Sequence, residues 1–533
     1  MFQQLLTPVA DSLPASFIVA VLPIATALVM LGILRRPAWQ ASLGGLVVGL
    51  VLAIGVWQLP VGLALDSVAN GMVFALLPVM WIVFTALLLY NVAVATGRFD
   101  SFRNWVLDHL PNDRRIVLVV IGFCFGALLE GVAGFGVPVA ITSSLLIMVG
   151  YPPVEALVYT LIFNTAPVAF GALGVPITVL GAVTGLKATA LGAMVGRQLP
   201  LFALFLPCYV MAAYGGMRSV RALFPVLIVA GASFGFAQFF TANFLDYALT
   251  DVVSSLTSLI CTIGFLRVWQ PAPDPEYAIK ADIHTLERTG VPPSWQGWIP
   301  WVLVAGIVIV WTHLKIAAIG QVAVKWPGLH NAVFITLYKK AYAAVWLFQP
   351  LGTGTAILLS VLIAALALGC GPARLGRAVV DTFVQIRIAI LTVMLIVGLA
   401  FLLNYSGMAY TLGLGVASVG VFFPLVSPFL GWIAVFLSGS DTSGNALFGN
   451  LQAVAANQLN LNPVLFAATN SSGGVMGKMI SPQNISTGVS TTDLKGHEGV
   501  VFARTFTHSV VLTIALGILV AIQQYVIPWI IPS

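Results

Sequence analysis

The sequence predicts an all-helical polytopic membrane protein, and three observations support this prediction. Of the 533 residues, 59% are hydrophobic and only 8% are charged, whereas a soluble domain has about a quarter charged residues. Apolar stretches recur from residue 16 to residue 531. They are continuously apolar, as in 16–34, whereas the strands of a membrane barrel alternate in hydrophobicity. Helices are therefore expected to cross the membrane along the whole chain.

The expected spans follow one another at intervals set by the bilayer. A helix needs roughly 20 apolar residues to cross it, so the chain has room for about 12 to 14 spans, some of them broken or re-entrant. The apolar segments lie at 16–34, 38–57, 72–96, 115–130, 137–150, 154–172, 199–217, 222–243, 247–266, 298–318, 350–370, 376–403, 409–438, 445–480 (in broken pieces) and 506–531.

Basic residues predict the orientation of these spans. Arg35 and Arg36 follow the first span, and positively charged loops remain in the cytoplasm. Four more arginines flank the loop after the third span, namely Arg98, Arg103, Arg114 and Arg115. The N-terminus is therefore expected outside, with 267–297 as the largest cytoplasmic loop. The lysines of 315–349 run against this rule, because they fall on the expected outer side. The net charge of +6 fits basic loops and gives no reason to expect a nucleic-acid partner.

A weak internal repeat relates residues 72–190 to residues 376–490. At an offset of about 310 Gly97 falls on Gly407, and nearby offsets pair Pro153 with Pro463, Gly131 with Gly439, and Asn164, Gly171 and Pro176 with Asn470, Gly477 and Pro482. Chance is the alternative, because glycine and proline are abundant. Basic residues follow the span before Gly97 but precede the span before Gly407, so the copies are expected to run in opposite directions. Inverted repeats with interrupted helices are typical of secondary transporters.

Ionisable side chains inside apolar segments mark candidate functional positions. Each costs roughly 2.5 to 3.5 kcal/mol on the insertion scale, so it must pair, bind a ligand or line water. For any one of them, a structural ion pair or a misplaced span end is the alternative. The residues concerned are Glu130, Asp381, Arg387, Asp441 and Lys478. Arg387 lies ten residues beyond Arg377, about 15 Å along a helix, which predicts a position near the middle of the membrane.

Two pairs of segments predict helix breaks around these residues. Glu130 and Gly136 lie in LLEGVAGFGVPVAI (128–141), where glycine and proline interrupt the helix and free backbone N–H groups that suit an anion. The matching segment FLSGSDTSGNALFGNLQ (436–452) carries Asp441, Ser443 and Asn445. Irregular backbone at membrane depth is tolerated where it lines a cavity. A polar turn outside the membrane is the alternative.

The downstream segments are NTAPVAFGALGVPI (164–177) and NSSGGVMGKMISPQNISTG (470–488). The second contains Asn470, Lys478 and Ser481, and a point cation beside freed N–H groups suits a small anion. A role of Lys478 as the counter-ion of Asp441 is the alternative. Nucleotide-binding and hydrolase motifs are absent, and the six histidines are dispersed without ligand spacing. We therefore expect neither an enzyme nor a cofactor or metal site.

These segments resemble the L-lactate permease family, whose members include glycolate permeases. The resemblance covers nearly the whole chain, least securely 190–350, and is most specific in 128–141, 164–177, 402–413 (LLNYSGMAYTLG), 438–452 and 470–485. It implies a bacterial inner-membrane symporter that imports lactate, and often glycolate, with protons. The expected substrates are therefore L-lactate and the related 2-hydroxymonocarboxylates D-lactate and glycolate. A sodium-coupled carboxylate carrier and, from another class, an organic-anion channel are the alternatives.

The roles of single residues follow from depth and chemistry. The substrate carboxylate is expected at Gly136 and Ser481 and at Lys478 or Arg387. Its 2-hydroxyl group is expected at Ser443, Asn445 or Asn470. Glu130 and Asp441 are the candidate proton carriers, because burial favours the neutral form of a carboxyl group. Glu130 is the stronger candidate, since its sequence neighbours are apolar.

Overall fold

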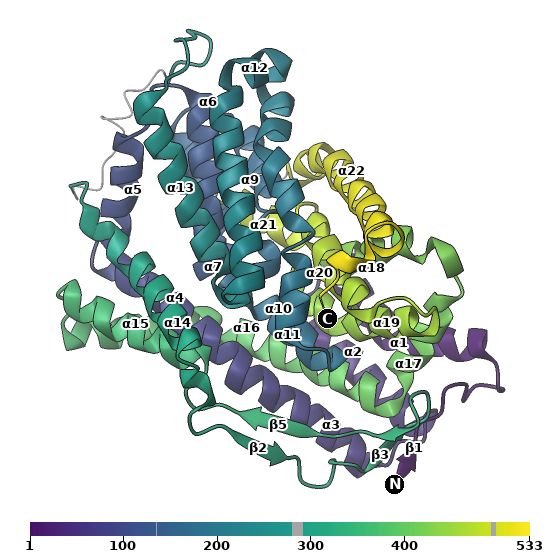
Figure 1. Cartoon of the computed structure of the whole chain (residues 1–533). Coiled ribbons are helices and arrows are strands. Elements are labelled where there is room, and N and C mark those ends of the chain that lie inside the picture. The colour runs from purple at the N-terminus through teal and green to yellow at the C-terminus, as the bar shows by residue number, and fades with distance from the viewer. Residues whose placement is uncertain (135, 280–291, 492–496, 533) are drawn as a thin grey trace.

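The computed structural model describes residues 1–134, 136–279, 292–491 and 497–532, and most of them are helical (Figure 1). The first thirteen helices are α1 (Leu13–Gly32), α2 (Ala38–Gly55), α3 (Val61–Phe74), α4 (Met80–Ala95), α5 (Arg98–Asp108), α6 (Arg114–Val117), α7 (Gly126–Val132), α8 (Val137–Met148), α9 (Pro153–Phe163), α10 (Gly171–Thr184), α11 (Ala188–Val195), α12 (Leu199–Phe244) and α13 (Thr250–Val268). Residues 280–291 of the expected cytoplasmic loop lie outside the described residues.

The later helices are α14 (Ile299–His313), α15 (Thr353–Ala367), α16 (Pro372–Ser406), α17 (Met408–Ala417), α18 (Phe423–Ser438), α19 (Asp441–Gln458), α20 (Pro463–Lys478), α21 (Pro482–Thr491) and α22 (Glu498–Tyr525). Two π-helical stretches, η1 (Ala75–Val79) and η2 (Leu118–Phe125), join α3 to α4 and α6 to α7. The short 3-10 helices are η3 (Val168–Phe170), η4 (Tyr247–Leu249), η5 (Trp295–Trp298), η6 (Ile316–Ala318), η7 (Gly420–Phe422) and η8 (Pro528–Ile530).

The prediction of a polytopic helical protein is confirmed. Within the described residues ten helical segments are long and apolar enough to cross a bilayer, and the bent pair α9–α10 makes an eleventh. One of the ten contains α12, which reverses direction at Gly216, where φ is +66°. Gly231 packs on the backbone of Leu204. Gly235 likewise packs on Pro200, so α12 is an antiparallel hairpin of two spans. The second half of this hairpin is therefore a twelfth span. Twelve is the lower limit of the range, about 12 to 14 spans, that the length predicts.

Three helix breaks follow one another within 72–190. Gly97, with a φ of +69°, separates α4 from α5. Gly134 and Gly136 separate α7 from α8, with φ values of +53° and +86°. A turn of 64° separates α9 from α10. A positive φ is the left-handed backbone region that glycine occupies without steric cost, which is why the first two breaks coincide with glycines.

The same order of helices and breaks occurs within 376–490. Gly407, with a φ of +104°, separates α16 from α17, and Gly439, with a φ of +71°, separates α18 from α19. Residues 479–481 separate α20 from α21. Helices α19 and α20 pack against α10. The α7–α8 and α9–α10 breaks of the first region and the α18–α19 and α20–α21 breaks of the second therefore lie close together in the interior.

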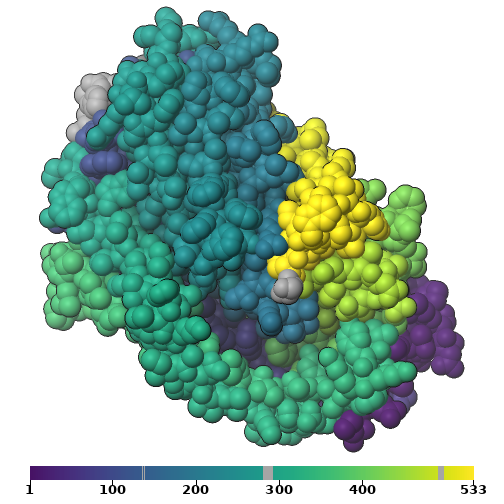
Figure 2. Space-filling view, in the orientation of Figure 1, coloured from purple at the N-terminus to yellow at the C-terminus, as the bar shows by residue number. Residues whose placement is uncertain are grey.

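Five short strands lie at the end of the molecule that carries the N-terminus (Figure 1). They are β1 (Phe2–Gln3), β2 (Val322–Lys325), β3 (Val333–Ile335), β4 (Lys340–Ala341) and β5 (Val345–Phe348). Strand β3 pairs in parallel with β1 and antiparallel with β4, and β2 pairs antiparallel with β5. Figure 2 shows this segment against the first residues of the chain. The sequence analysis predicted no strands, and these form because backbone pairing satisfies a segment that has too many lysines for a span.

Helix α7 belongs to the centre of the protein. The segment Arg114–Val132, which contains α6, η2 and α7, is buried along its whole length. Helices α8, α9, α12 and α13 pack around η2, and α10 and α13 pack against α7. Any polar side chain on α7 is therefore surrounded by protein and not by lipid.

Candidate functional site

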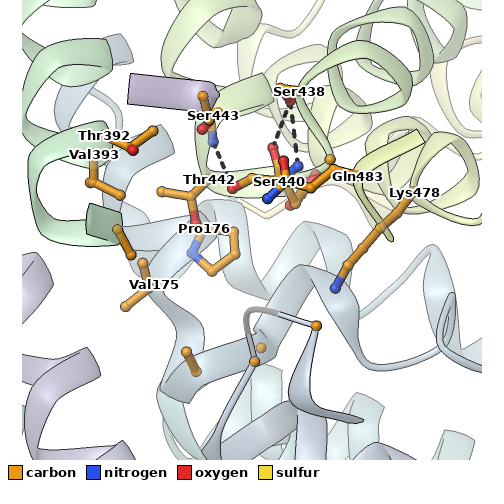
Figure 3. Close-up of a pocket in the computed structure, with 18 of the residues that line it drawn as sticks. Val175, Pro176, Thr392, Val393, Ser438, Ser440, Thr442, Ser443, Lys478 and Gln483 are labelled. Atoms are coloured by element: carbon orange, nitrogen blue, oxygen red, sulfur yellow. Dashed lines mark hydrogen bonds between the residues drawn. The ribbon is translucent and has the colours of Figure 1, made fainter. Parts of the chain in front are cut away.

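A cavity of about 340 Å³ lies between the helix breaks of the two regions. Its wall comprises the α7–α8 break, the start of α10, one face of α16, the α18–α19 break and the residues around the α20–α21 junction. A water molecule takes roughly 30 Å³ of liquid, so the cavity has room for a molecule of a few heavy atoms with some water. Figure 3 shows Lys478 on one side of this space with Gln483, Ser438 and Ser440. Val175, Val393 and Thr392 lie on the opposite side, and Thr442 and Pro176 lie between them.

Lys478 and Glu130 form a buried ion pair at this cavity. Lys478 Nζ lies 2.7 Å from Glu130 Oε1, and the two side chains are only 8% and 4% exposed. Asn164 donates a hydrogen bond of 3.0 Å to the other carboxylate oxygen, Oε2. Both oxygens are therefore satisfied, as a buried charge requires. The structure pairs Lys478 with Glu130, whereas the sequence analysis considered Asp441 as its counter-ion.

The local sequence explains why the two charges can meet. A methyl group on Gly171 would come within 2.9 Å of Glu130 Oε1, so a glycine is needed beside the carboxylate. Helix α20 starts where Asn462 Oδ1 accepts a hydrogen bond of 2.9 Å from Val464 N. It ends at Lys478, where a cation is favoured by the helix dipole.

The sequence analysis inferred the environment of Glu130 from its apolar neighbours alone, and the structure adds a counter-ion to it. Its counter-ion comes from a residue 348 positions away in the sequence, on the helix that ends the second repeat region. The immediate neighbours of Glu130 along α7 therefore do not define the environment of its carboxylate.

Asp441 is the second carboxylate that lines the cavity, in the first turn of α19. Ser471 Oγ donates a hydrogen bond of 2.5 Å to Asp441 Oδ2, and Asn445 donates one of 3.2 Å to the same atom. Oδ1 is buried and has no hydrogen-bond partner among the described residues. Ser440 caps the helix by accepting a bond of 3.3 Å from Ser443 N. The site thus has one carboxylate oxygen without a protein donor beside the positive end of a helix.

Asn445 and Asn470 lie behind the cavity wall and are fully buried. Asn470 donates a hydrogen bond of 2.9 Å to Asn445 Oδ1, and Gln452 donates one of 2.8 Å to Asn470 Oδ1. Asn445 also donates to the Pro176 carbonyl oxygen at 3.2 Å. In place of the expected contact with a ligand, these amides hold α19, α20 and α10 together and orient Asp441.

Gly136 and Ser443 line the cavity, in agreement with their position at helix starts. Gly136 is the first residue before α8, so the freed N–H groups of that helix lie at the cavity wall. Ser481 lies at the α20–α21 junction, next to Gly439. A methyl group added to Gly439 would come within 2.9 Å of Ser481 Oγ. Ser481 Oγ is buried without a hydrogen-bond partner among the described residues.

Arg387 is not part of this site. Five residues of α16 line the cavity, namely Gln385, Ile388, Ala389, Thr392 and Val393. At 100° per residue they cover one side of the helix, and Arg387 projects from roughly the opposite side, where it is exposed. The sequence predicted its depth from its distance along the helix, but depth does not determine which face of the helix a residue occupies.

Two residues of the site were missed as site residues in the sequence analysis. Asn164 was noted there as a match between the repeats, whereas its hydrogen bond to Glu130 becomes visible only in three dimensions. Asp251 is fully buried on α13 and interacts electrostatically with Glu130 and Lys478. It lies within the apolar segment 247–266, so the rule that singled out Glu130, a charge inside a span, applies to it as well.

Comparisons with known proteins agree with these observations. A sequence model described as L-lactate permease matches residues 16–527. The chain is 39% identical to the glycolate permease GlcA of Escherichia coli K12, over 96% of both chains. It is 38% identical to an L-lactate permease of Bacillus subtilis 168, over 99% of both chains. Among solved structures, Neisseria gonorrhoeae MtrF aligns with a TM-score of 0.50 at 12% identity, covering 94% of this chain and 97% of that one, which shows a similar fold.

Proposed function

The chain belongs to the L-lactate permease family, and on that basis we propose that it imports L-lactate and related 2-hydroxymonocarboxylates, D-lactate and glycolate, together with protons. It works by alternating access in the inner membrane of a bacterium. Relatives named as lactate and glycolate permeases support the substrate class. The observation that carries the mechanism is the buried Lys478–Glu130 pair at a cavity between two sets of helix breaks.

The substrate carboxylate replaces Glu130 on Lys478. Lys478 is the one cation among the described residues that line the cavity. A hydrogen bond to a charged group contributes about 1.5 to 3 kcal/mol. The freed backbone N–H groups at Gly136 and at the start of α19 add positive potential at the same wall.

The displaced Glu130 carries the proton. A buried carboxylate that loses its partner costs about 3 to 5 kcal/mol, so it takes up a proton from the side to which the cavity is open. One proton then enters with each anion. After release of both, the Lys478–Glu130 pair forms again. Asp441, with its free Oδ1, is the alternative carrier.

The 2-hydroxyl group of the substrate meets the polar wall beside Lys478. Ser443, Thr442 and Asp441 line the cavity there. These three side chains take the role that the sequence analysis assigned to Ser443, Asn445 and Asn470. A site that hydrogen-bonds a hydroxyl group rejects analogues without it, because its own polar groups would remain unpaired.

The cavity of this conformation leads toward the cytoplasm. A second cavity, of about 710 Å³, is lined by Arg35 and Arg36 and shares Ala38 and Gln483 with the first. Basic loops stay inside, so the N-terminus and the strands lie outside. On that outer side, Tyr342 stacks on Tyr405, with ring centroids 4.1 Å apart.

The contacts of the two glycine breaks support an inverted arrangement of 72–190 and 376–490. Helix α5, directly after Gly97, packs against η5 at the start of α14. Gly407 packs against the backbone of Leu5, next to β1. This is the end of the molecule with the strands, and the chain runs from the C-terminal end of α14 to that end, where it enters β2. Helix α14 has 15 residues, which is roughly 22 Å. These contacts support a topology in which the two breaks lie toward opposite faces of the membrane.

Uptake of labelled lactate into proteoliposomes tests the proposal. A pH step, acid outside, should drive accumulation above the external concentration without sodium. Accumulation that requires a sodium gradient would identify the sodium-coupled alternative. Equilibration without accumulation under either gradient would identify a channel. Pyruvate, which lacks the hydroxyl group, and glycolate report on the polar wall.

A further inference from the structure

Asp251 is a buried carboxyl group that the transport steps above do not use. It lies in the first turn of α13, where its residue is only 1% exposed. Neither Oδ1 nor Oδ2 has a hydrogen-bond partner among the described residues. An ionised carboxylate in such surroundings costs several kcal/mol unless a cation faces it directly. Burial without a partner therefore favours the neutral, protonated form of this carboxyl group.

The position of Asp251 connects it to the transport site. Helix α13 packs against α7, and a methyl group on Gly131 would come within 2.7 Å of Asp251 Cβ. Gly131 follows Glu130 directly, and its lack of a side chain permits this close approach. Asp251 interacts electrostatically with both Glu130 and Lys478. A charge on Asp251 would therefore act on the pair, although only Glu130 forms the ion pair with Lys478.

The other titratable groups around α13 are engaged elsewhere. Cys124 of η2 lies 3.2 Å from Ser258 Oγ, two turns further along α13. Asp246, before η4, accepts hydrogen bonds of 2.9 Å from Ala248 N and from Thr312 of α14. The Tyr247 hydroxyl lies 3.0 Å from Thr178 of α10. The charges that act on Asp251 are therefore those of the transport pair.

We propose that Asp251 is a proton-binding positioning residue, which must hold a proton before Lys478 can leave Glu130 and bind the substrate anion. This inference rests on the proposed function of that pair. With Asp251 neutral, an incoming carboxylate competes with Glu130 alone. With Asp251 ionised, a second negative charge holds the lysine and repels the anion. Proton loss from Asp251 at higher pH therefore weakens anion binding, although the residue does not line the cavity.

Binding of labelled lactate to the purified protein, measured across pH at equal pH on both sides, tests this inference. Each proton linked to binding raises Kd by up to about tenfold per pH unit above its titration range. In the wild type two protons are linked, one at Glu130 and one at Asp251. Asp251→Asn, which keeps the shape and is always neutral, should lower the limiting slope of log Kd against pH by one. Asp251→Ser, whose side chain is smaller, should lower the slope by the same amount. It serves as the second variant in case the asparagine amide disrupts the packing of α13 on α7.

Asp246→Asn is the matched control, since it removes another acid, a partly buried one, near the same end of α13 and should leave the slope unchanged. A purely structural role of Asp251 would lower thermal stability without changing the slope, and an unchanged slope in both Asp251 variants would overturn the inference. Failure of the proposed function would give a different result from failure of this inference. In that case the wild type itself would bind lactate with no pH dependence and take up no proton on binding.

Discussion

At the scale of single residues, the geometry makes Lys478 and Glu130 act as one unit. Each is the other's buried partner, so the loss of either one leaves an uncompensated charge. Variants of the two must therefore be interpreted together. A double variant with glutamine at both positions separates the loss of the ion pair from the loss of the lysine that binds the substrate carboxylate.

Lys478→Gln should weaken lactate binding by about 1.5 to 3 kcal/mol, roughly 10- to 150-fold, because it removes the charged hydrogen bond to the substrate carboxylate. Equilibrium binding of labelled lactate to purified protein measures the effect. Arg387→Gln is the control and should bind normally, because Arg387 projects away from the cavity. Normal affinity in Lys478→Gln would show that the backbone N–H groups hold the anion by themselves.

Glu130→Gln should abolish proton-driven accumulation but retain exchange of lactate between equal pools, because the amide cannot carry a proton through the cycle. Asp441→Asn should impair binding and exchange together, since the carboxylate accepts hydrogen bonds from Ser471 and Asn445 and orients the start of α19. Proteoliposomes with and without a pH step measure both activities. Full accumulation by Glu130→Gln would transfer the carrier role to another acid.

At the scale of elements, the helix breaks set the distances within the site. Helices α7, α19 and α20 each place a charged side chain within a turn of a break, so small backbone shifts at the glycines move these charges relative to one another.

Gly171→Ala tests this control of distance. The added methyl group would lie within 2.9 Å of Glu130 Oε1, closer than real contacts allow, and should displace the carboxylate from Lys478. We expect a loss of proton-driven accumulation with little loss of protein in the membrane. Gly55→Ala is the control, because a methyl group at this helical position meets no atom within 4 Å. Equal activity of the two variants would contradict the assigned distance.

The sequence could predict the elements better than it could predict the pairing of charges. Apolar length predicts spans, and the glycines of 128–141 and 436–452, among them Gly136 and Gly439, predict breaks, because both properties are local. The partner of Glu130 could not be predicted, since it comes from a helix 348 residues away. Arg387 was misplaced because the facing of a helix depends on its neighbours. The parallel pairing of β3 could not be predicted, because its partner β1 lies at the start of the chain.

At the scale of the whole molecule, the proposed topology places the two repeat regions in opposite directions. Arg98→Cys beside Gly97 should react with thiol reagents only from the cytoplasm. Lys339→Cys, in the exposed turn between β3 and β4, should react from outside. Labelling of intact cells with a membrane-impermeant reagent, in a background without Cys124, Cys208, Cys261 and Cys370, measures this. Labelling of both positions from the same side would exclude an inverted arrangement.

The ion pair between Lys478 and Glu130 also bears on the energy source of the cell. When a substrate anion displaces Glu130, a proton neutralises Glu130. The anion and the proton cross the membrane together, so the net charge that crosses in one import step is zero. One elementary charge is worth about 2.3 kcal/mol per 100 mV of membrane potential, and this carrier would neither gain nor lose that amount. A cell with an inside-negative voltage would therefore not repel its nutrient anion. The same carrier would run backwards and export acid whenever fermentation raised the internal product of lactate and proton concentrations above the external one.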